Sequence, residues 1–411
     1  MASSSARLPP RFALPPTRRE KPIPLPLPEE VKAKLYNHPQ AQRIRSGQLG
    51  EWFTTPLVGG EWTECGKRAK PDRIGMTFMA INAVSANPEP TNEPARRVNH
   101  SRYIKTHPAI SRELEEKIAP KYGTAREMDL RYQVWIDEAA ELAEEALDRQ
   151  MRPARQLRWE EMTPLSTDLE RAFDQFATYL IQAFHLCSEA SGPWNGLIHY
   201  GFAEVKSYLA YELFDYNLMA GLLRNRVMAN GGGVGVQVDG LEAGLIDVCN
   251  ESSHGFVGQV NRDFAAVVFA IDVLFNSILL GMAQLAQGGA CSRFDRHLMT
   301  QLIQDCARHT TFGCRRISFY LRNCPDREEA AIKLHLVADR LEPLQTEHHL
   351  LNPKVLEPLA ILAWGGAEAT ERGMGIIREF WPRFATDYLA RLDSIGLTRR
   401  DRCLIPARAP F

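Results

Sequence analysis

The stretch from Leu302 to Arg316, LIQDCARHTTFGCRR, places a cysteine three residues before a histidine. Residues three apart lie on the same face of an α-helix, so the side chains of Cys306 and His309 would point in one direction. A glutamate in place of the cysteine would complete a Glu-x-x-His pair, in which a carboxylate and an imidazole serve one metal centre. The spacing indicates either a metal site with an unusual ligand or the outline of a site that binds no metal.

A di-iron carboxylate site in a helical bundle needs one carboxylate from each of two helices and a Glu-x-x-His pair from each of two others. The one Glu-x-x-His in this sequence runs from Glu251 to His254, in the polar segment DVCNESSHGF. Cys306 and His309 would form the second pair, and Asp305 stands one residue out of phase. The single carboxylates would have to come from other apolar helices, with these candidates: Glu204, Glu212 and Asp272.

Two interpretations of these residues stay open. A self-sufficient di-iron or other metal oxygenase would use five of them: Glu204, Glu251, His254, Asp272 and His309. Such a site has two of its six positions wrong in type or poorly placed. The alternative is a buried polar cluster of Asp272, Arg308 and His309, in which Arg308 pairs with a carboxylate on a facing helix. We favour the second interpretation, which assigns no catalytic, cofactor-binding or metal-binding residue to this chain.

Two further segments carry residue types that could bind ligands. The run ANGGGVGVQVDG lacks G-x-G-x-x-G in every frame and lacks the Gly-Lys-Ser/Thr of a P-loop, so it predicts a flexible loop between helices. Glu347, His348 and His349 are adjacent in sequence, and adjacent helical side chains point about 100° apart. These three residues are therefore expected to lie on the surface or to cap a helix.

Composition places the chain among ordinary soluble proteins. The 411 residues are 45% hydrophobic and 24% charged, with a net charge of −1, so no basic surface for nucleic acid is expected. The eight cysteines form no C-x-x-C pair, which favours reduced thiols in a cytoplasmic protein. No apolar segment of the signal-peptide type follows the N-terminus. The apolar run FAAVVFAIDVLFNSILLGMAQLA contains Asp272, Asn276 and Gln284, so it predicts a buried helix and not a membrane span.

The chain changes character near residue 125, and three regions are expected. Residues 1–125 are rich in Pro, Arg, Asn and Gly and predict an irregular region in which KPIPLPLPEE (Lys21 to Glu30) forms an extended, polyproline-like arm. Such an arm is either a disordered leader, a segment packed on another subunit, or a ligand for an SH3-type module. One short strand or hairpin is possible in this region. Residues 126–325 predict a core of long helices, and residues 326–411 a C-terminal helical region.

Apolar residues recur at spacings of three and four throughout the second and third regions. Stripes of this kind predict helices around residues 128–146, 169–184, 198–223, 264–282 and 298–317, and a last helix around 377–395 that Pro382 breaks or starts. Long helices with wide apolar faces pack as bundles, so the fold class is mainly α.

The helical half resembles the β-subunit of the hydroxylase component of bacterial multicomponent monooxygenases, which belongs to the ferritin-like superfamily. REMDLRYQVWIDEAAELAEEALDRQ is similar to the segment that opens the helical body of those subunits. LIQDCARHTTFGCRRISFYL is similar to their helix with an Asp-Ala-Glu-Arg-His-like sequence, and NRDFAAVVFAIDVLFNSILL lies at a comparable distance upstream. The resemblance covers roughly residues 126–325 and, more loosely, GIIREFWPRFATDYLARLDSI.

This resemblance implies a ferritin-like bundle that keeps the fold without the metal ligands. Cys306 would then stand where a metal-binding relative has glutamate. The chain would be a non-catalytic subunit with no cofactor of its own, while a partner α-subunit holds the di-iron centre. The implied partners are that α-subunit, a small γ-subunit, a regulatory protein and a reductase, with no nucleic acid and no membrane. Residues 330–370 and the enlarged N-terminal region have no counterpart in the resemblance, and a helical adaptor unrelated to oxygenases remains an alternative.

Overall fold

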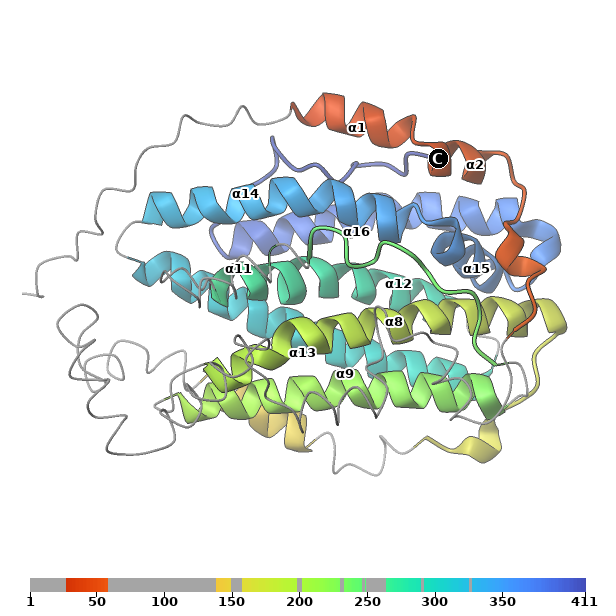
Figure 1. The fold of residues 1–411 in the computed structure, drawn as a ribbon, viewed down its shortest axis with the longest axis horizontal. Helices are drawn as coiled ribbons and strands as arrows, with labels where there is room; N and C mark the ends of the chain where they lie inside the picture. The colour runs from red at the N-terminus through yellow and green to blue at the C-terminus, as the bar shows by residue number, and fades with distance from the viewer. Residues whose placement is uncertain are drawn as a thin grey trace, which may run out of the picture.

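The computed structural model describes most of the chain's helical part and two shorter N-terminal pieces. It describes residues 27–57, 138–148, 157–197, 202–229, 233–245, 248, 264–289, 292–324 and 327–411. These residues are mainly helical and contain no strand, which confirms the mainly α part of the predicted fold class. The helices lie nearly along one axis and form an elongated body (Figure 1).

Four long helices form the inner bundle. α8 and α9 are joined by a short link and run antiparallel, and so do the central helix and α13. The central helix is continuous through α11 (Phe264–Val268), a π-helical segment η5 (Phe269–Phe275) and α12 (Asn276–Gly288). The other three helices are α8 (Thr167–Leu197), α9 (Ala203–Ala229) and α13 (Arg293–Asn323). The predicted stripes at 169–184, 198–223, 264–282 and 298–317 are thus confirmed.

The order of the four helices around the bundle follows from their contacts. α8 packs on α9, α9 on α13, α13 on η5 and α12, and the central helix returns to α8. One ring pair and one ion pair show the relative direction of α9 and α13. Tyr208 near the start of α9 stacks on Phe312 of α13, whereas Arg226 near the end of α9 pairs with Asp295 at the start of α13. α9 and α13 are therefore antiparallel, so α9 and the central helix run in the same direction. The segment that connects them in sequence must return along the length of the bundle.

A second layer of helices covers the central helix on its other side. α14 (Arg327–Gln345) contacts η5 and α13, α15 (Pro353–Trp364) contacts α8 and α12, and α16 (Thr370–Ser394) contacts α12 and α13. A π-helical turn, η6 (Thr346–Leu350), links α14 to α15. In Figure 1 the second layer and α9 lie on opposite sides of the central helix.

The position of the central helix explains its composition. A helix that is apolar all round belongs inside a protein or a membrane. In the described part of the chain, one helix, Phe264–Gly288, is long and apolar enough to span a membrane, and 94% of its most apolar window is buried within this fold. The apolar run is therefore accounted for as the helix between the two layers.

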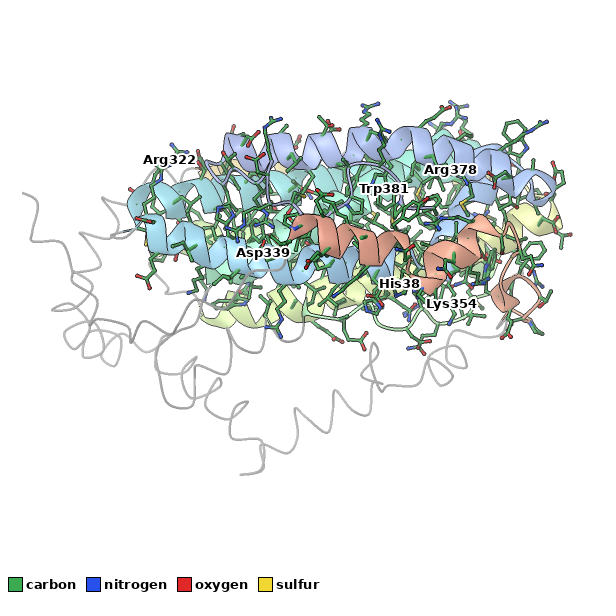
Figure 2. The ribbon with its side chains drawn as sticks, turned by 90° about the horizontal axis from the view of Figure 1, so that it is seen from above. His38, Arg322, Asp339, Lys354, Arg378 and Trp381 are labelled. Carbon is green, nitrogen blue, oxygen red and sulfur yellow. The ribbon has the colours of Figure 1, made fainter. Side chains whose placement is uncertain are left out.

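The N-terminal helices pack on the outside of the second layer (Figure 2). α1 (Pro28–Tyr36) starts with Pro28, which suits the first helical position because its missing N–H has no partner there anyway. The extended arm predicted up to Glu30 is thus wrong for its last three residues, whereas Leu27 before them is extended and residues 21–26 lie outside the described residues. α2 (Pro39–Arg45) and the 3₁₀ turn η1 (Glu51–Phe53) follow.

Glu357 of α15 fixes this N-terminal segment. Its carboxylate accepts hydrogen bonds from Trp52 Nε1 at 2.6 Å, the Gly50 backbone N–H at 2.8 Å and Arg43 Nη2 at 3.0 Å. Of the residues on which a strand or hairpin was predicted, 50–57 are described and form no strand, with Glu51–Phe53 in the 3₁₀ turn, and the others lie outside the described ranges.

Pro382 neither breaks nor starts a helix, contrary to the prediction. α16 runs from Thr370 to Ser394 with Pro382 inside it. Proline removes one backbone hydrogen bond and displaces the carbonyl four residues earlier, here that of Arg378. Pro382 lies on the exposed side of the helix, where water can satisfy that carbonyl, whereas Trp381 beside it is buried.

The glycine-rich segment after α9 is held along α8 and is not a free loop. Gln175 donates to the Val236 carbonyl at 2.8 Å and accepts from the Val236 N–H at 2.7 Å. One and two turns further along α8, Thr178 accepts from Gly235 at 2.8 Å and Gln182 accepts from Val238 at 2.9 Å. Residues 233–240 form no helix or strand, so the predicted loop between helices is confirmed there, but hydrogen bonds from α8 side chains hold its backbone in place.

Gln175→Ala should release this segment locally. Both backbone groups of Val236 would lose their partners, at about 1–3 kcal/mol. We expect amide hydrogen exchange at Val236 to become about tenfold faster or more. Gln237→Ala, which changes an exposed side chain in the same segment, is the control. Unchanged exchange at Val236 in Gln175→Ala would contradict the described attachment.

Candidate functional site

Charged and polar side chains from three helices meet in the middle of the four-helix bundle. We call this set the buried polar cluster. α9 and α13 each contribute side chains that are three or four residues apart on one face. The central helix contributes side chains that face both of them. Its members are Tyr208, Glu212, Asp215 and Tyr216 of α9, Asp272 and Asn276 of the central helix, and Asp305, Cys306, Arg308 and His309 of α13. All ten are buried.

Arg308 supplies the positive charge of the buried polar cluster. Its Nη2 donates to Asp215 of α9 and, at 3.0 Å, to Asp305 one turn earlier on α13. His309 Nε2 lies 3.3 Å from the same Asp215 carboxylate. Burial acts to lower the pKa of Arg308, but the charges of Asp215 and Asp305 outweigh it and raise the pKa. The predicted pairing of Arg308 with a carboxylate on a facing helix is confirmed.

Glu212 and Asp272 form the second half of the cluster. Tyr216 donates to Glu212 Oε1 at 2.9 Å, and Asn276 donates to the Tyr216 hydroxyl at 2.8 Å. Burial raises the pKa of Asp272 well above its usual value, and the negative charge of Glu212 raises it further. The raised pKa favours the protonated, neutral form of the Asp272 side chain.

Aromatic rings separate the cluster from solvent. Tyr208 stacks on Phe312 with ring centroids 4.0 Å apart, and Tyr216 meets His309 edge-on at 4.6 Å. α8 contributes Phe184, whose ring lies 6.2 Å from that of Tyr216. These rings exclude water, so charges in the cluster must be neutralised within it.

α13 and the central helix approach closely beside Asp272. A Cβ atom added at Gly313 would lie 2.5 Å from Cβ of Asp272, so only glycine fits at this position of α13. The π-helical turn η5 carries Asp272 at the same place. Single π-turns inside α-helices occur frequently at functional sites.

The cluster does not fit a di-iron centre. No three His, Cys, Asp or Glu side chains of the described residues are arranged to hold a metal ion. Burial and then the Asp305 charge raise the pKa of Cys306, so it is a neutral thiol, whereas a metal ligand would be a thiolate. The guanidinium of Arg308 already lies among the carboxylates.

The structure brings together some of the candidate residues and separates others. Glu212, Asp272, Cys306 and His309 lie in the buried polar cluster, and so does Asp305. Glu204 lies in the first turn of α9, is partly exposed and does not belong to the cluster. The remaining two candidates fall outside the described residues: Glu251 and His254.

Asp215 is the residue that sequence reasoning missed. It stands three residues after Glu212, so Glu212-x-x-Asp215 has the spacing of a Glu-x-x-His pair with aspartate in the histidine position. A search for that spacing with any acidic or imidazole side chain would have found it beside Cys306-x-x-His309.

His349 is buried, although a surface or capping position was predicted. Its Nδ1 lies 3.1 Å from the Tyr179 hydroxyl and its Nε2 3.1 Å from the Leu241 carbonyl. Burial lowers the pKa of His349 to about 3, so it is a neutral bridge between α8 and the glycine-rich segment. Glu347 and His348 are partly exposed as expected, and Glu347 pairs with His38 at 3.1 Å.

A second buried charge group lies further along the same helices. Arg226 of α9 donates at 2.6 Å to both Asp295 of α13 and Glu170 of α8. Asp174 lies one turn from Glu170, and neither of its carboxylate oxygens has a hydrogen-bond partner in the described part of the chain. Burial raises the pKa of Asp174 to about 9, with the charge of Glu170 adding to the shift.

Asp174 therefore makes stability depend on pH. An unfolded aspartate has a pKa of about 3.9, so between pH ~4 and ~9 the folded state holds a proton that the unfolded state has lost. The free energy of unfolding should fall as pH rises through this window, by up to about 1.4 kcal/mol per pH unit from this group. Asp174→Asn should remove that dependence.

Urea unfolding at pH 5 and pH 8 measures this effect. The advantage of Asp174→Asn over the wild type should grow from pH 5 to pH 8. Asp168→Asn, which changes an exposed side chain at the start of α8, is the matched control and should show no such growth. A constant difference between Asp174→Asn and the wild type would contradict the raised pKa.

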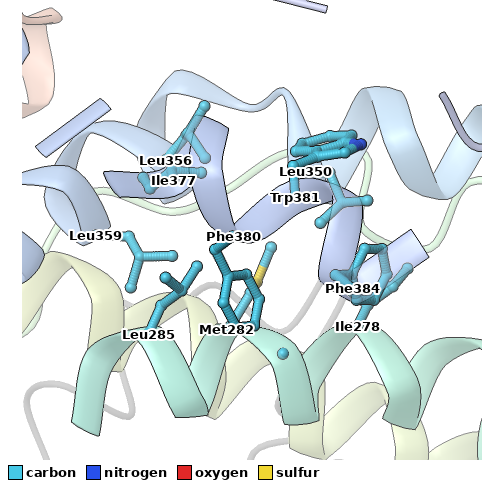
Figure 3. A pocket seen from close by; sticks show the side chains of 11 residues that line it. Ile278, Met282, Leu285, Leu350, Leu356, Leu359, Ile377, Phe380, Trp381 and Phe384 are labelled. Atoms are coloured by element: carbon cyan, nitrogen blue, oxygen red, sulfur yellow. The ribbon is translucent and has the colours of Figure 1, made fainter. Parts of the chain in front are cut away.

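An apolar pocket opens between α12, α15 and α16 (Figure 3). Its lining includes Met282, Leu359, Phe380 and Phe384, and its space is about 330 Å³ when the part open to solvent is included. Trp381, at its edge, already donates its N–H to the Pro406 carbonyl at 2.7 Å. The pocket therefore offers no polar group for catalysis, and the chemistry-bearing residues remain those of the buried polar cluster.

Comparison of the chain with protein-family models, curated proteins and solved structures found no match. The function therefore has to be argued from the cluster and the arrangement of its helices.

Proposed function

We propose that this chain is a non-catalytic structural subunit of a di-iron monooxygenase. It would scaffold a catalytic α-subunit for O₂-dependent hydroxylation or epoxidation of a small organic substrate in the cytoplasm. The observation that supports the proposal is the buried polar cluster, in which the spaced pairs on α9 and α13 face each other and Arg308 supplies the positive charge.

The arrangement of the bundle supports a ferritin-like fold for this subunit. Ferritin-like bundles join two antiparallel helix pairs by one long crossover connection. Here α8 and α9 form one pair, the central helix and α13 form the other, and residues 230–263 connect them. Glu212-x-x-Asp215 and Cys306-x-x-His309 occupy facing positions on the second and fourth helices.

The ligand types argue for a scaffold and against a self-sufficient oxygenase. Of its proposed ligands, Asp272 and His309 lie in the cluster, whereas Glu204 lies apart from it. Asp215 and Cys306 replace the histidine and the glutamate of the two spaced pairs, and a neutral thiol cannot neutralise iron. A chain with these replacements keeps the bundle and leaves the chemistry to its partner.

The proposal predicts that a larger Glu-x-x-His protein is encoded beside this gene, and coexpression of the two chains tests it. We expect a stable complex in which iron belongs to the partner and hydroxylation requires both chains. A small γ-subunit, a regulatory protein and a reductase would complete the system. Failure of the two chains to associate would contradict the proposal and favour an unrelated helical adaptor.

His309→Gln and Asp272→Asn in this chain distinguish a structural subunit from a self-sufficient oxygenase. Both side chains would be metal ligands in a self-sufficient oxygenase, so both substitutions would remove iron and activity. For a scaffold, the complex should retain its iron and most of its turnover. Circular dichroism of each variant confirms that the bundle is still folded.

A further inference from the structure

The buried polar cluster contains more negative charge than Arg308 alone neutralises. Four carboxyl groups from three helices meet there, with exposed fractions of 1% for Glu212, 0% for Asp215, 2% for Asp272 and 2% for Asp305. Arg308 bonds two of them, Asp215 and Asp305, through its Nη2. Arg308 makes no hydrogen bond to Glu212 or Asp272 in the described part of the chain, and Glu212 accepts one from Tyr216.

Donors and acceptors of the cluster are incompletely matched. Glu212 Oε2, Asp272 Oδ1 and His309 Nδ1 have no hydrogen-bond partner among the described residues. The same holds for Nε and Nη1 of Arg308, although a guanidinium has five donors to satisfy. Carboxylate oxygens and an imidazole nitrogen are ligand types that metal cations use in proteins. The residue types of the cluster are thus those of a metal shell, although with Arg308 in place they are not arranged to hold an ion.

We infer that the Arg308 guanidinium stands in for a metal cation and excludes one from the bundle. The three helices keep carboxylates and an imidazole around a single positive charge, and Arg308 carries that charge on α13 itself. Cys306, one turn before His309 on the same face, is a position from which a restored carboxylate would join the cluster. The inference concerns this chain alone and does not depend on the proposed partner.

The full chain with Cys306→Glu and Arg308→Ala tests this inference. Removing the guanidinium leaves the carboxylates without a cation, and the new glutamate adds a ligand beside His309. We expect the double variant to bind Co²⁺ nearly stoichiometrically, with the visible absorption bands of protein-bound cobalt and at least about tenfold more bound metal than the wild type. Metal content by mass spectrometry after desalting gives the amount.

Two matched variants locate the metal. Adding His309→Gln to the double variant should weaken Co²⁺ binding about tenfold or more, because an imidazole ligand is lost. Cys306→Glu with Arg308→Lys keeps a cation in the cluster and should bind no cobalt. Circular dichroism shows whether each variant is folded.

Three results would overturn the inference. The first is a folded double variant that binds no more Co²⁺ than the wild type. The second is equal binding by the Arg308→Lys variant. The third requires no variant at all: stoichiometric Co²⁺ binding by the wild-type chain would show that Arg308 does not exclude metal. Because the wild-type measurement stands by itself, the inference stays testable if the double variant fails to fold. None of these results concerns association with a partner, so they are distinguishable from failure of the proposed function.

Discussion

Asp215→Asn should lower the free energy of unfolding by about 3–5 kcal/mol, whereas Asp272→Asn should change it by less than about 1 kcal/mol. Asp215 balances Arg308 and contacts His309, so its loss leaves a buried guanidinium with reduced neutralisation. Asp272 is held as a neutral acid, which an asparagine side chain imitates in shape and charge. Two Asp→Asn substitutions in the same cluster are thus expected to differ strongly in their effect on the free energy of unfolding.

Urea unfolding followed by circular dichroism measures both variants. Asp387→Asn, on the exposed face of α16, is the control for a surface aspartate and should change stability by less than about 1 kcal/mol. Equal losses for Asp215→Asn and Asp272→Asn would contradict the assignment of a charged carboxylate to Asp215 and a neutral acid to Asp272.

Glu342→Ala should release the C-terminal segment and cost about 3–5 kcal/mol. The Glu342 carboxylate, fully buried on α14, accepts from Arg399 Nε at 2.9 Å and Nη2 at 2.8 Å, from Tyr388 at 3.0 Å and from the Leu404 N–H at 2.6 Å. Among the described residues, its removal leaves Asp339 as the one carboxylate paired with the buried Arg399.

Limited proteolysis and urea unfolding test this prediction together. Cleavage after α16, between residues 395 and 411, should become much faster in Glu342→Ala. Glu379→Ala removes an exposed carboxylate of α16 and should leave both measurements unchanged. A Glu342→Ala protein as stable and as resistant as the wild type would contradict the role of this carboxylate.

The long helices could be predicted from sequence because their apolar spacing is set by the faces they bury. α8, α9 and α13 lie where three- and four-residue spacings placed them. Short helices and breaks were less predictable. α1 begins at Pro28 within an apparent polyproline run, and α16 continues through Pro382, which lies on its exposed side.

The cluster could be predicted in part, since Arg308, His309 and Asp272 were expected to meet. Asp215 was missed because it departs in residue type from the expected histidine, although its spacing from Glu212 is correct. The burial of His349 depends on Tyr179 and the Leu241 carbonyl, which are far away in sequence. Contacts of that kind leave no local pattern in the chain.

The iron content of the full-length chain, expressed alone with ample iron and shown by circular dichroism to be helical, tests the central claim most directly. We expect iron far below one ion per chain, because Arg308 occupies the cluster and Cys306 is a neutral thiol. A folded chain that carries about two iron ions would contradict the scaffold function and make this chain the oxygenase itself.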